Sequence, residues 1–309
     1  MKLPLPGFLL LGLNEYKRSI KGSITSYSWF TLLIIISTYM LFSEDYTAMK
    51  INRSIMSFKY GETPMTDILI FYSSSLISSV SDILPGEIPS DSFPISIGVA
   101  FFIIFPFFLG LILISKFITA RATASIAKEK EKKTLYILTV SPHTRHAIYL
   151  GKLVGIFLLT LPMIAFLYIA TNWIFIVLFQ GAPNPGMRVL ETASITTILF
   201  ASIGLLVSVS SCDEKKASWR GLRIITAMAA LTAVWIFIPF IGFLLNLTNK
   251  NIDFLPALER ITFISPLTMD LVSVYNPAAA MDYLIIQLIA SFIFLILGMF
   301  IFIRQDIEY

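Results

Sequence analysis

Charged residues are scarce in this sequence. Asp, Glu, Lys and Arg make up 14% of its 309 residues, whereas hydrophobic residues make up 56%. A soluble domain of this size carries about a quarter charged residues. The deficit points to an exterior that faces lipid, and it excludes an ordinary soluble globular domain.

Cysteine and histidine are almost absent. Cys212 is the single cysteine, so neither an internal disulfide nor a cysteine metal cluster can form. His143 and His146 are the two histidines, and no acidic or thiol partner accompanies them. A Gly-x-x-x-x-Gly-Lys-Ser/Thr loop for ATP is also missing, because Gly151-Lys152 is followed by leucine. We therefore expect no catalytic site, metal or cofactor in this chain.

Long uncharged stretches are the first positive feature. A helix that crosses a bilayer needs about 20 mostly apolar residues. Six stretches meet this requirement, once the turn sequence at 181–186 is taken as the end of the longest. The predicted fold is an all-α integral membrane protein with six transmembrane helices, at 23–43, 93–115, 153–179, 192–212, 224–249 and 283–303.

The basic residues give these helices a direction. With the N-terminus inside, 17 of the 23 Lys and Arg lie in inner segments and 6 in outer segments. Lys and Arg accumulate in the cytoplasmic loops of membrane proteins. We therefore predict a multi-pass protein of the cell (plasma or inner) membrane with both termini cytoplasmic. Its inner loops are 116–152 and 213–223, and its two long outer loops are 44–91 and 250–282, with Arg188 in a short outer segment between the third and fourth spans.

The predicted spans contain no Asp, Glu, Lys, Arg or His. Ion-coupled carriers and proton pumps usually hold such groups at membrane depth. Their absence argues against a secondary transporter, although backbone carbonyls and hydroxyls can still bind sodium. The uncharged spans favour an apolar or lipid-like cargo, or force applied to an outer partner without passage through the membrane.

Three segments outside the spans have a pattern of their own. Residues 7–22 are predicted to be an amphipathic interfacial helix, because Leu9, Leu13, Tyr16 and Ile20 recur at helical spacing among polar residues. The loop 44–91 is long enough to be a docking surface for an extracytoplasmic protein. In 250–282, three prolines break any single helix, so two short helices dipping into the outer leaflet are expected.

The inner loop 116–152 carries the most informative pattern. Four alanines at 120–127 favour a helical continuation of the second span, and Ser141-Pro142 is a helix start. Gly151 and Gly155 have the spacing that permits close helix contact. The loop is predicted to be a helix–turn–helix elbow suited to docking against another protein. The alternative is a solvated charge run that only sets the topology.

This elbow resembles the signature of ABC-2 type transporter permeases, the membrane subunits of type V ABC exporters. Their pattern is roughly Glu-x-Glu-x-Gly-Thr-Leu-Glu-x-Leu-Leu-x-x-Pro-x-Ser/Thr-Arg, followed by Gly-Lys. The matching positions are Glu129, Glu131, Thr134, Leu135, Leu138, Pro142, Thr144, Arg145, Gly151 and Lys152. Lys133 stands where glycine is usual, Tyr136 where glutamate is usual, and Thr139 where a second leucine is usual.

The resemblance implies an ABC-2 permease fold and a subunit of an ATP-driven exporter. In such permeases the elbow is the coupling-helix region, lodged in a cytoplasmic ABC ATPase. Two ATPase copies bind ATP and Mg and act on two permease subunits, identical or homologous. The implied ATPase-coupling residues are Glu129, Glu131, Thr134, Leu135, Leu138, Pro142 and Arg145, with a smaller contact from Tyr16, Lys17, Arg18 and Lys21.

Two other classes of function stay open at this point. The chain is alternatively a membrane scaffold or sensor that recruits a cytoplasmic partner without transport, or a stand-alone channel or carrier. For the exporter, a hydrophobic, lipid-like or peptide substrate is expected, with membrane lipid and no nucleic acid among the partners.

Overall fold

The computed structural model describes residues 6–42, 93–135, 144–178, 186–246, 262–275 and 277–304. Within these ranges the secondary structure is entirely helical. The helices are α1 (Gly7–Ile20), the 3-10 turn η1 (Lys21–Ser23), α2 (Ile24–Phe42), α6 (Phe93–Glu131), α8 (Arg145–Leu178), α9 (Gly186–Val209), α10 (Glu214–Asn246), α12 (Pro266–Tyr275) and α13 (Pro277–Arg304). The predicted outer loop 44–91 lies outside the described residues.

Five described stretches are long and apolar enough to cross a membrane. They are Gly7–Ile36, Phe107–Glu131, Arg145–Trp173, Met187–Val209 and Met281–Arg304. The remaining predicted span, 224–249, coincides with α10 over residues 224–246. The all-helical architecture agrees with the prediction.

The helices are longer than the uncharged stretches in the sequence. α10 begins at Glu214, ten residues before the predicted span, and α6 continues through the charged residues to Glu131 as one helix of 39 residues. An uncharged stretch marks the part of a helix that suits lipid, whereas the hydrogen-bonded backbone continues into solvent. The predicted helical continuation of the second span is therefore correct.

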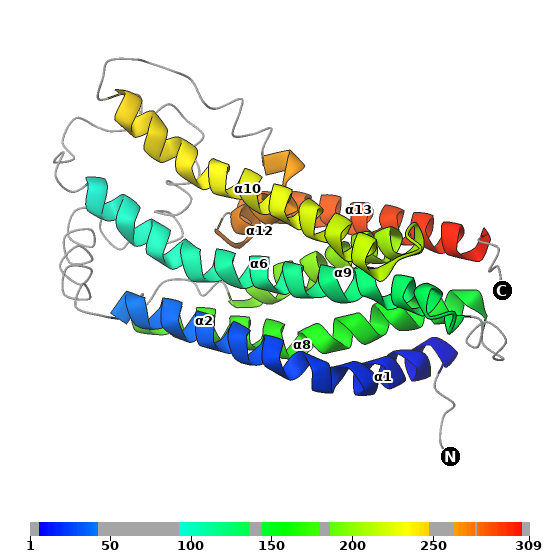
Figure 1. Ribbon diagram of the computed structural model, residues 1–309. Helices are drawn as coiled ribbons and strands as arrows, with labels where there is room; N and C mark the ends of the chain where they lie inside the picture. The colour runs from blue at the N-terminus through cyan, green and yellow to red at the C-terminus, as the bar shows by residue number, and fades with distance from the viewer. Residues whose placement is uncertain are drawn as a thin grey trace.

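The long helices run side by side, and the start of α1 and the end of α13 lie at the same end of the bundle (Figure 1). The most extensive contacts join α1 with α8, α6 with α9, and α13 with α9. Among the candidate spans, α9 is the most enclosed and α13 one of the least. α12 packs against α13, α9, α10 and α6, so the predicted broken segment includes a short helix inside the bundle.

The packing is apolar both inside and outside. Large side chains such as Leu111 and Ile118 on α6 and Leu159 on α8 are buried. On α13, however, Phe292, Ile293 and several neighbours are more than half exposed. An apolar outer face on a single-chain bundle is what a helix in contact with lipid requires.

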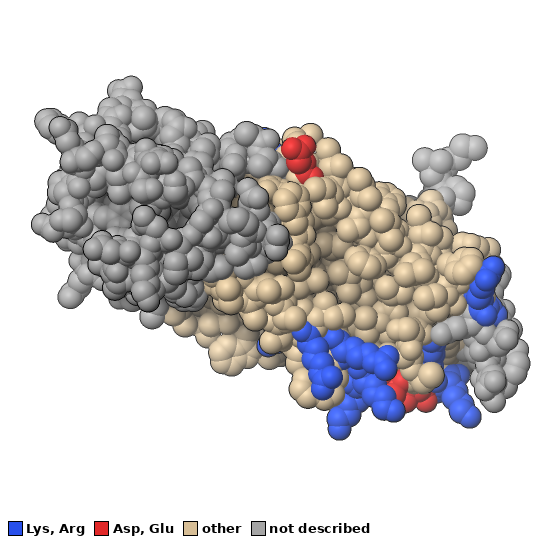
Figure 2. Space-filling view, turned by 90° about the horizontal axis from the view of Figure 1, so that it is seen from above, with Lys and Arg blue, Asp and Glu red and all other residues tan. Residues whose placement is uncertain are grey.

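Basic side chains gather on the half of the molecule where α1 begins and α13 ends (Figures 1 and 2). The exposed Lys215, Lys216, Arg220 and Arg223 lie on the first turns of α10, and Lys128 lies on the last turns of α6. Charge and the predicted elbow thus occupy the same end of the bundle.

Candidate functional site

The predicted coupling elbow lies where α6 ends and α8 begins. Residues 136–143 lie outside the described residues, so Leu138 and Pro142 are not placed. The site residues that are placed are Glu129 and Glu131 on the last turn of α6, Thr134 and Leu135 directly after it, and Arg145 at the start of α8.

Lys133 ends α6 in a left-handed backbone conformation, with φ at 55°. Its N–H donates to Lys130 O at 3.0 Å, and the N–H of Thr134 donates to Glu129 O at 2.9 Å. These two bonds form a Schellman motif, in which glycine usually occupies the left-handed position. The departure from the family pattern at Lys133 therefore falls on a position where a side chain is strained.

Lys152 on α8 joins three helices through two ion pairs. Its Nζ lies 2.5 Å from Oε1 of Glu129 on α6 and 3.1 Å from Oε2 of Glu15 on α1. Lys152 is 5% exposed and Glu129 is 7% exposed, whereas Glu15 is half-buried. Because charges are almost never fully buried unless they are paired, this triad (Glu15, Glu129 and Lys152) holds the base of the elbow together.

One carboxylate oxygen of the triad remains unsatisfied. Glu129 Oε2 is buried and has no hydrogen-bond partner among the described residues. Glu129 thus faces the interior of its own chain. As placed, it orients the elbow and does not present its charge at the surface.

Glycines bring α1 directly against α8. A Cβ on Gly151 would lie 2.7 Å from Leu11 Cβ, and a Cβ on Gly155 would lie 2.9 Å from Glu15 Cβ. On the opposing helix, a Cβ on Gly12 would lie 2.7 Å from Val154 Cγ1. The close contact that the Gly151–Gly155 spacing permits is present in the structure, and it places Glu15 beside Lys152.

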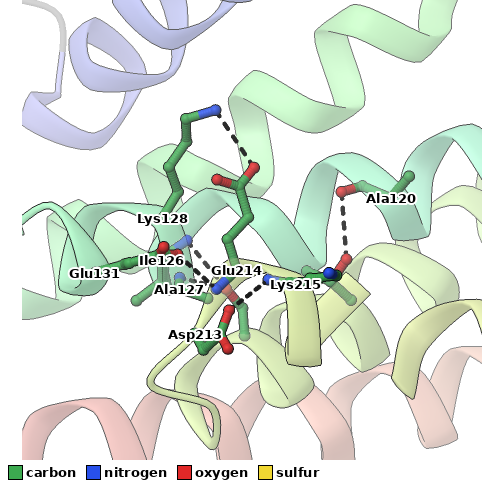
Figure 3. Close-up of polar contacts among 10 residues, drawn as sticks. Ala120, Ile126, Ala127, Lys128, Glu131, Asp213, Glu214 and Lys215 are labelled. Atoms are coloured by element: carbon green, nitrogen blue, oxygen red, sulfur yellow. Dashed lines mark hydrogen bonds and ion pairs between the residues drawn. The ribbon is translucent and has the colours of Figure 1, made fainter. Parts of the chain in front are cut away.

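The end of α6 is also tied to the start of α10 (Figure 3). Glu131 Oε2 accepts a hydrogen bond from Glu214 N at 2.9 Å, and Lys128 Nζ lies 3.3 Å from Glu214 Oε1. Asp213 Oδ1 accepts from Lys215 N at 2.8 Å, which caps the first turn of α10. Glu131 is nevertheless exposed, so its carboxylate remains accessible to a partner.

The end of α9 also contacts the last turns of α6. Ser208 Oγ accepts hydrogen bonds from Ile126 N at 3.0 Å and Ala127 N at 2.9 Å. Lys130 Nζ donates to Val209 O. The last two turns of α6 are therefore fixed by α8, α9 and α10 together.

The other predicted contact residues have different surroundings. Thr134 is exposed, whereas Leu135 is 2% exposed and belongs to the hydrophobic core. Arg145 is half-buried, and its Nη1 donates to Ile303 O at 2.7 Å, in the last turn of α13. Thr134 and Glu131 are thus the exposed members of the placed set.

The second predicted contact lies along α1 and η1. Lys17, Arg18 and Lys21 are exposed, and Tyr16 packs against the core. The apolar stripe of this helix divides between two environments, since Leu13 is 37% exposed while the buried face is centred on Gly12. The exposed leucine suits a helix that lies at a membrane surface.

Sequence reasoning did not identify the partners within the triad. Lys152 is a position of the family motif and Glu15 is one of the polar residues of the first helix, but no local pattern pairs the two. The available signal was a lysine inside an apolar helix, directly after Gly151 and near Gly155. A lysine on a close-contact face needs a carboxylate on the opposing helix.

No group of three or more His, Cys, Asp or Glu that could hold a metal exists among the described residues. What the geometry offers is a rigid elbow at the basic end of an apolar bundle. The long apolar helices define a multi-pass membrane protein.

A family model for ABC-2 family transporter proteins matches residues 13–307. The chain therefore belongs to the ABC-2 transporter family, as the elbow sequence predicted. Members of this family are membrane components without a catalytic site of their own, and they work with separate ABC ATPase subunits. No curated protein matches the chain.

Proposed function

We propose that this chain is the permease subunit of an ATP-driven exporter, with six transmembrane helices and both termini cytoplasmic. It pairs with a second permease, identical or homologous, and with two copies of a cytoplasmic ABC ATPase that binds ATP and Mg. The observation that carries the proposal is the buried triad, because it fastens the elbow to α1, α6 and α8 at the basic end of the bundle.

The triad explains how force on the elbow would reach the spans. α1 is locked to α8 at the glycine contact, and Lys152 joins both helices to the end of α6. A displacement of the elbow by the ATPase would then move three helices as one body. ATP binding shifts the permease between two states only if the ATPase contact differs between them, and a rigid elbow transmits such a difference.

Exposure divides the predicted coupling residues into two roles. Glu131 and Thr134 are exposed and suit direct contact with the ATPase. Glu129 and Leu135 are buried and suit the role of holding the elbow in shape. Leu138, Pro142 and Arg145 remain proposed coupling residues, with Tyr16, Lys17, Arg18 and Lys21 as the smaller second contact.

The ATPase contact is tested with Glu131→Gln in the purified complex. Glutamine keeps an acceptor for Glu214 N but removes the charge, so it separates docking from folding. We expect weaker ATPase binding and less permease-dependent ATP hydrolysis, while Glu191→Gln, at an exposed site near the start of α9, leaves both unchanged. Equal behaviour of the two variants would count against Glu131 as a contact.

The topology is tested with the chain's own cysteine. Cys212 is exposed between α9 and α10, which the proposal places in the cytoplasm. A membrane-impermeant thiol reagent should label it only after the cells are opened. Cysteine introduced at Met187, 63% exposed at the start of α9, in a Cys212→Ser background should react in intact cells. The reverse pattern would invert the orientation.

The exported substrate is proposed to be hydrophobic, lipid-like or a peptide. The uncharged spans and the apolar bundle favour such a cargo over a small ion. A chain that purifies without an ATPase and conducts ions in liposomes would refute the exporter assignment and favour a stand-alone channel. A chain that binds the ATPase without any transport would instead indicate a scaffold.

A further inference from the structure

α12 is a short helix that packs against its neighbours through apolar side chains, such as Leu267 and Leu271, and through buried polar side chains. Just before it, Ser265 Oγ lies 2.7 Å from Thr232 Oγ1 of α10, and Thr268 Oγ1 lies 3.0 Å from the same atom. Ser265 Oγ also donates to Met228 O at 3.2 Å. All three hydroxyl side chains are buried. α12 is thus seated in the bundle by hydrogen bonds on its α10 side.

On its other side α12 presents a fully buried carboxyl. Asp270 is 0% exposed. Its Oδ2 lies 2.7 Å from Thr196 Oγ1 on α9, and its Oδ1 accepts from Gln287 Nε2 on α13 at 2.7 Å. The second Nε2 hydrogen of Gln287 is directed to Pro266 O at 3.1 Å. The acid therefore joins three helices in the interior of the bundle.

The hydrogen count at Thr196 favours a protonated acid. Thr196 Oγ1 lies 2.8 Å from Thr192 O as well as 2.7 Å from Asp270 Oδ2. A threonine hydroxyl has one hydrogen to donate. Both contacts become hydrogen bonds when the Asp270 hydroxyl donates to Thr196 Oγ1 and Thr196 donates to Thr192 O. With a carboxylate at position 270, one of the two contacts has no hydrogen.

No described cation neutralises this acid. The ion pairs of the described residues do not include Asp270. The charged and titratable groups on the helices packed against α12 are Arg188 and Glu191 on α9, Asp282, Tyr283 and Arg304 on α13, Glu214, Lys215, Lys216, Arg220 and Arg223 on α10, and those from Lys116 onward on α6. Arg188 is the cation nearest along α9, two helical turns or about 12 Å before Thr196.

Two further polar atoms mark the surroundings of Asp270 as a built polar site. Gln287 Oε1 and Thr192 Oγ1 are buried and have no hydrogen-bond partner among the described residues. Both side chains are more than nine-tenths buried, and both belong to the helices that hold Asp270. Buried polar atoms without a partner call for an explanation. A water molecule that carries a proton to or from Asp270 would find hydrogen-bond partners in these two atoms.

α12 lies outside the five spanning stretches. Burial raises the pKa of the Asp270 carboxyl to about 7, against smaller opposite effects of its hydrogen-bond contacts with Thr196 and Gln287.

We propose that Asp270 is a proton-binding site that governs the seating of α12. With the proton bound, the neutral acid ties α12 to α9 and α13. When the proton is lost, a bare carboxylate is left in the interior, and α12 loosens from the bundle. The inference does not depend on the ATPase partner, because it concerns the chain alone.

The test uses the full chain in lipid nanodiscs and compares Asp270→Asn with Asp282→Asn, an exposed carboxyl at the start of α13. Because the folded-state pKa lies above the unfolded value, folding stability falls as the pH rises toward 7 and levels off above it. We expect the thermal unfolding midpoint of wild type and of Asp282→Asn to fall between pH 5 and pH 8. Asp270→Asn should lose this fall, because asparagine cannot titrate. The same pH dependence in Asp270→Asn as in wild type would overturn the proposal.

Hydrogen exchange of wild type keeps the proposal testable if Asp270→Asn does not fold. Amide protection of residues 266–275, corrected for the intrinsic effect of pH, should decrease between pH 6 and pH 8 while protection of α9 stays constant. Unchanged protection of α12 would refute a proton-controlled seat. Restoration of protection at pH 8 by sodium chloride, but not by choline chloride, would also refute it, because the site would then bind a small cation.

Discussion

Replacing Lys152 with methionine tests whether the buried triad holds the elbow. Methionine keeps much of the apolar length of lysine but leaves Glu129 buried without a positive partner. Breaking a buried ion pair on one side costs about 3–5 kcal/mol, because the remaining charge stays uncompensated. We expect Lys152→Met to lower the free energy of unfolding by an amount in this range.

The double variant separates the pair from its surroundings. Glu129→Gln combined with Lys152→Met removes both charges, so the loss should be smaller than the sum of the two single losses. Residues in one ion-pair network couple by about 0.5–3 kcal/mol, and the burial of Lys152 and Glu129 places this pair near the upper end. Glu15 also loses its partner Lys152 in the double variant. Because Glu15 is half-buried and can turn toward water, this loss should not offset the stability that removal of the Glu129 charge restores.

A matched control is available a short distance away on α6. Lys128 and Glu214 form an ion pair whose side chains are 46% and 33% exposed. Exposed pairs contribute about 0–1 kcal/mol, so Lys128→Met should cost much less than Lys152→Met. Unfolding in mixed micelles with a denaturing detergent measures all of these variants. Equal costs for the two lysine variants, or additive single losses, would refute a buried, coupled triad.

Three further predictions concern single contacts. Lys133→Gly should raise stability by about 1 kcal/mol, because glycine adopts the left-handed conformation without strain; a drop in the unfolding free energy would contradict the Schellman ending of α6. Gly151→Ala should separate α1 from α8 and lower stability. Gly22→Ala should be nearly neutral, because its Cβ would lie 3.6 Å from the nearest atom, Arg121 Nη2. The thermal unfolding midpoints of the two variants distinguish these outcomes. Arg145→Ala should cost about 1–3 kcal/mol, because it removes a charged hydrogen bond to Ile303 O, and increased hydrogen exchange at the end of α13 would report the loss.

Local patterns in the sequence predicted the helices well. Apolar length identified the candidate spans, and the alanines at 120–127 correctly predicted that α6 continues past its apolar part. The ends of the helices are harder to predict, because a charged residue ends an uncharged stretch without ending the helix. α10, for example, begins at Glu214, where Asp213 caps it and Glu131 accepts its first N–H. That cap depends on a residue more than 80 positions away, which no local pattern contains.

Asp270 shows a different reason for a missed residue. It lies in a segment that three prolines break, outside every predicted span, so apolar length does not predict its burial. The structure packs α12 into the bundle and thereby places this carboxyl against Thr196 and Gln287. The predicted spans contain no Asp, Glu, Lys, Arg or His, but the interior of the molecule does contain a carboxyl, that of Asp270. Which groups occupy the interior depends on how a broken segment packs, and this is a tertiary property.

Two residues from the two ends of the family motif contact each other in this chain. Glu129 and Lys152 are 23 residues apart in sequence, yet their side chains are joined by an ion pair of 2.5 Å. The pair closes the base of the elbow, because it fixes the end of α6 to the first turns of α8. Closing a loop removes conformational entropy before any partner arrives, and a preorganised loop binds at a lower entropic cost. If the proposed function holds, the pair would therefore favour ATPase docking without contact with the ATPase. On this argument Glu129→Gln should weaken docking through the elbow's shape, whereas Glu131→Gln should weaken it through lost charge, and raised salt should reduce only the contribution of Glu131.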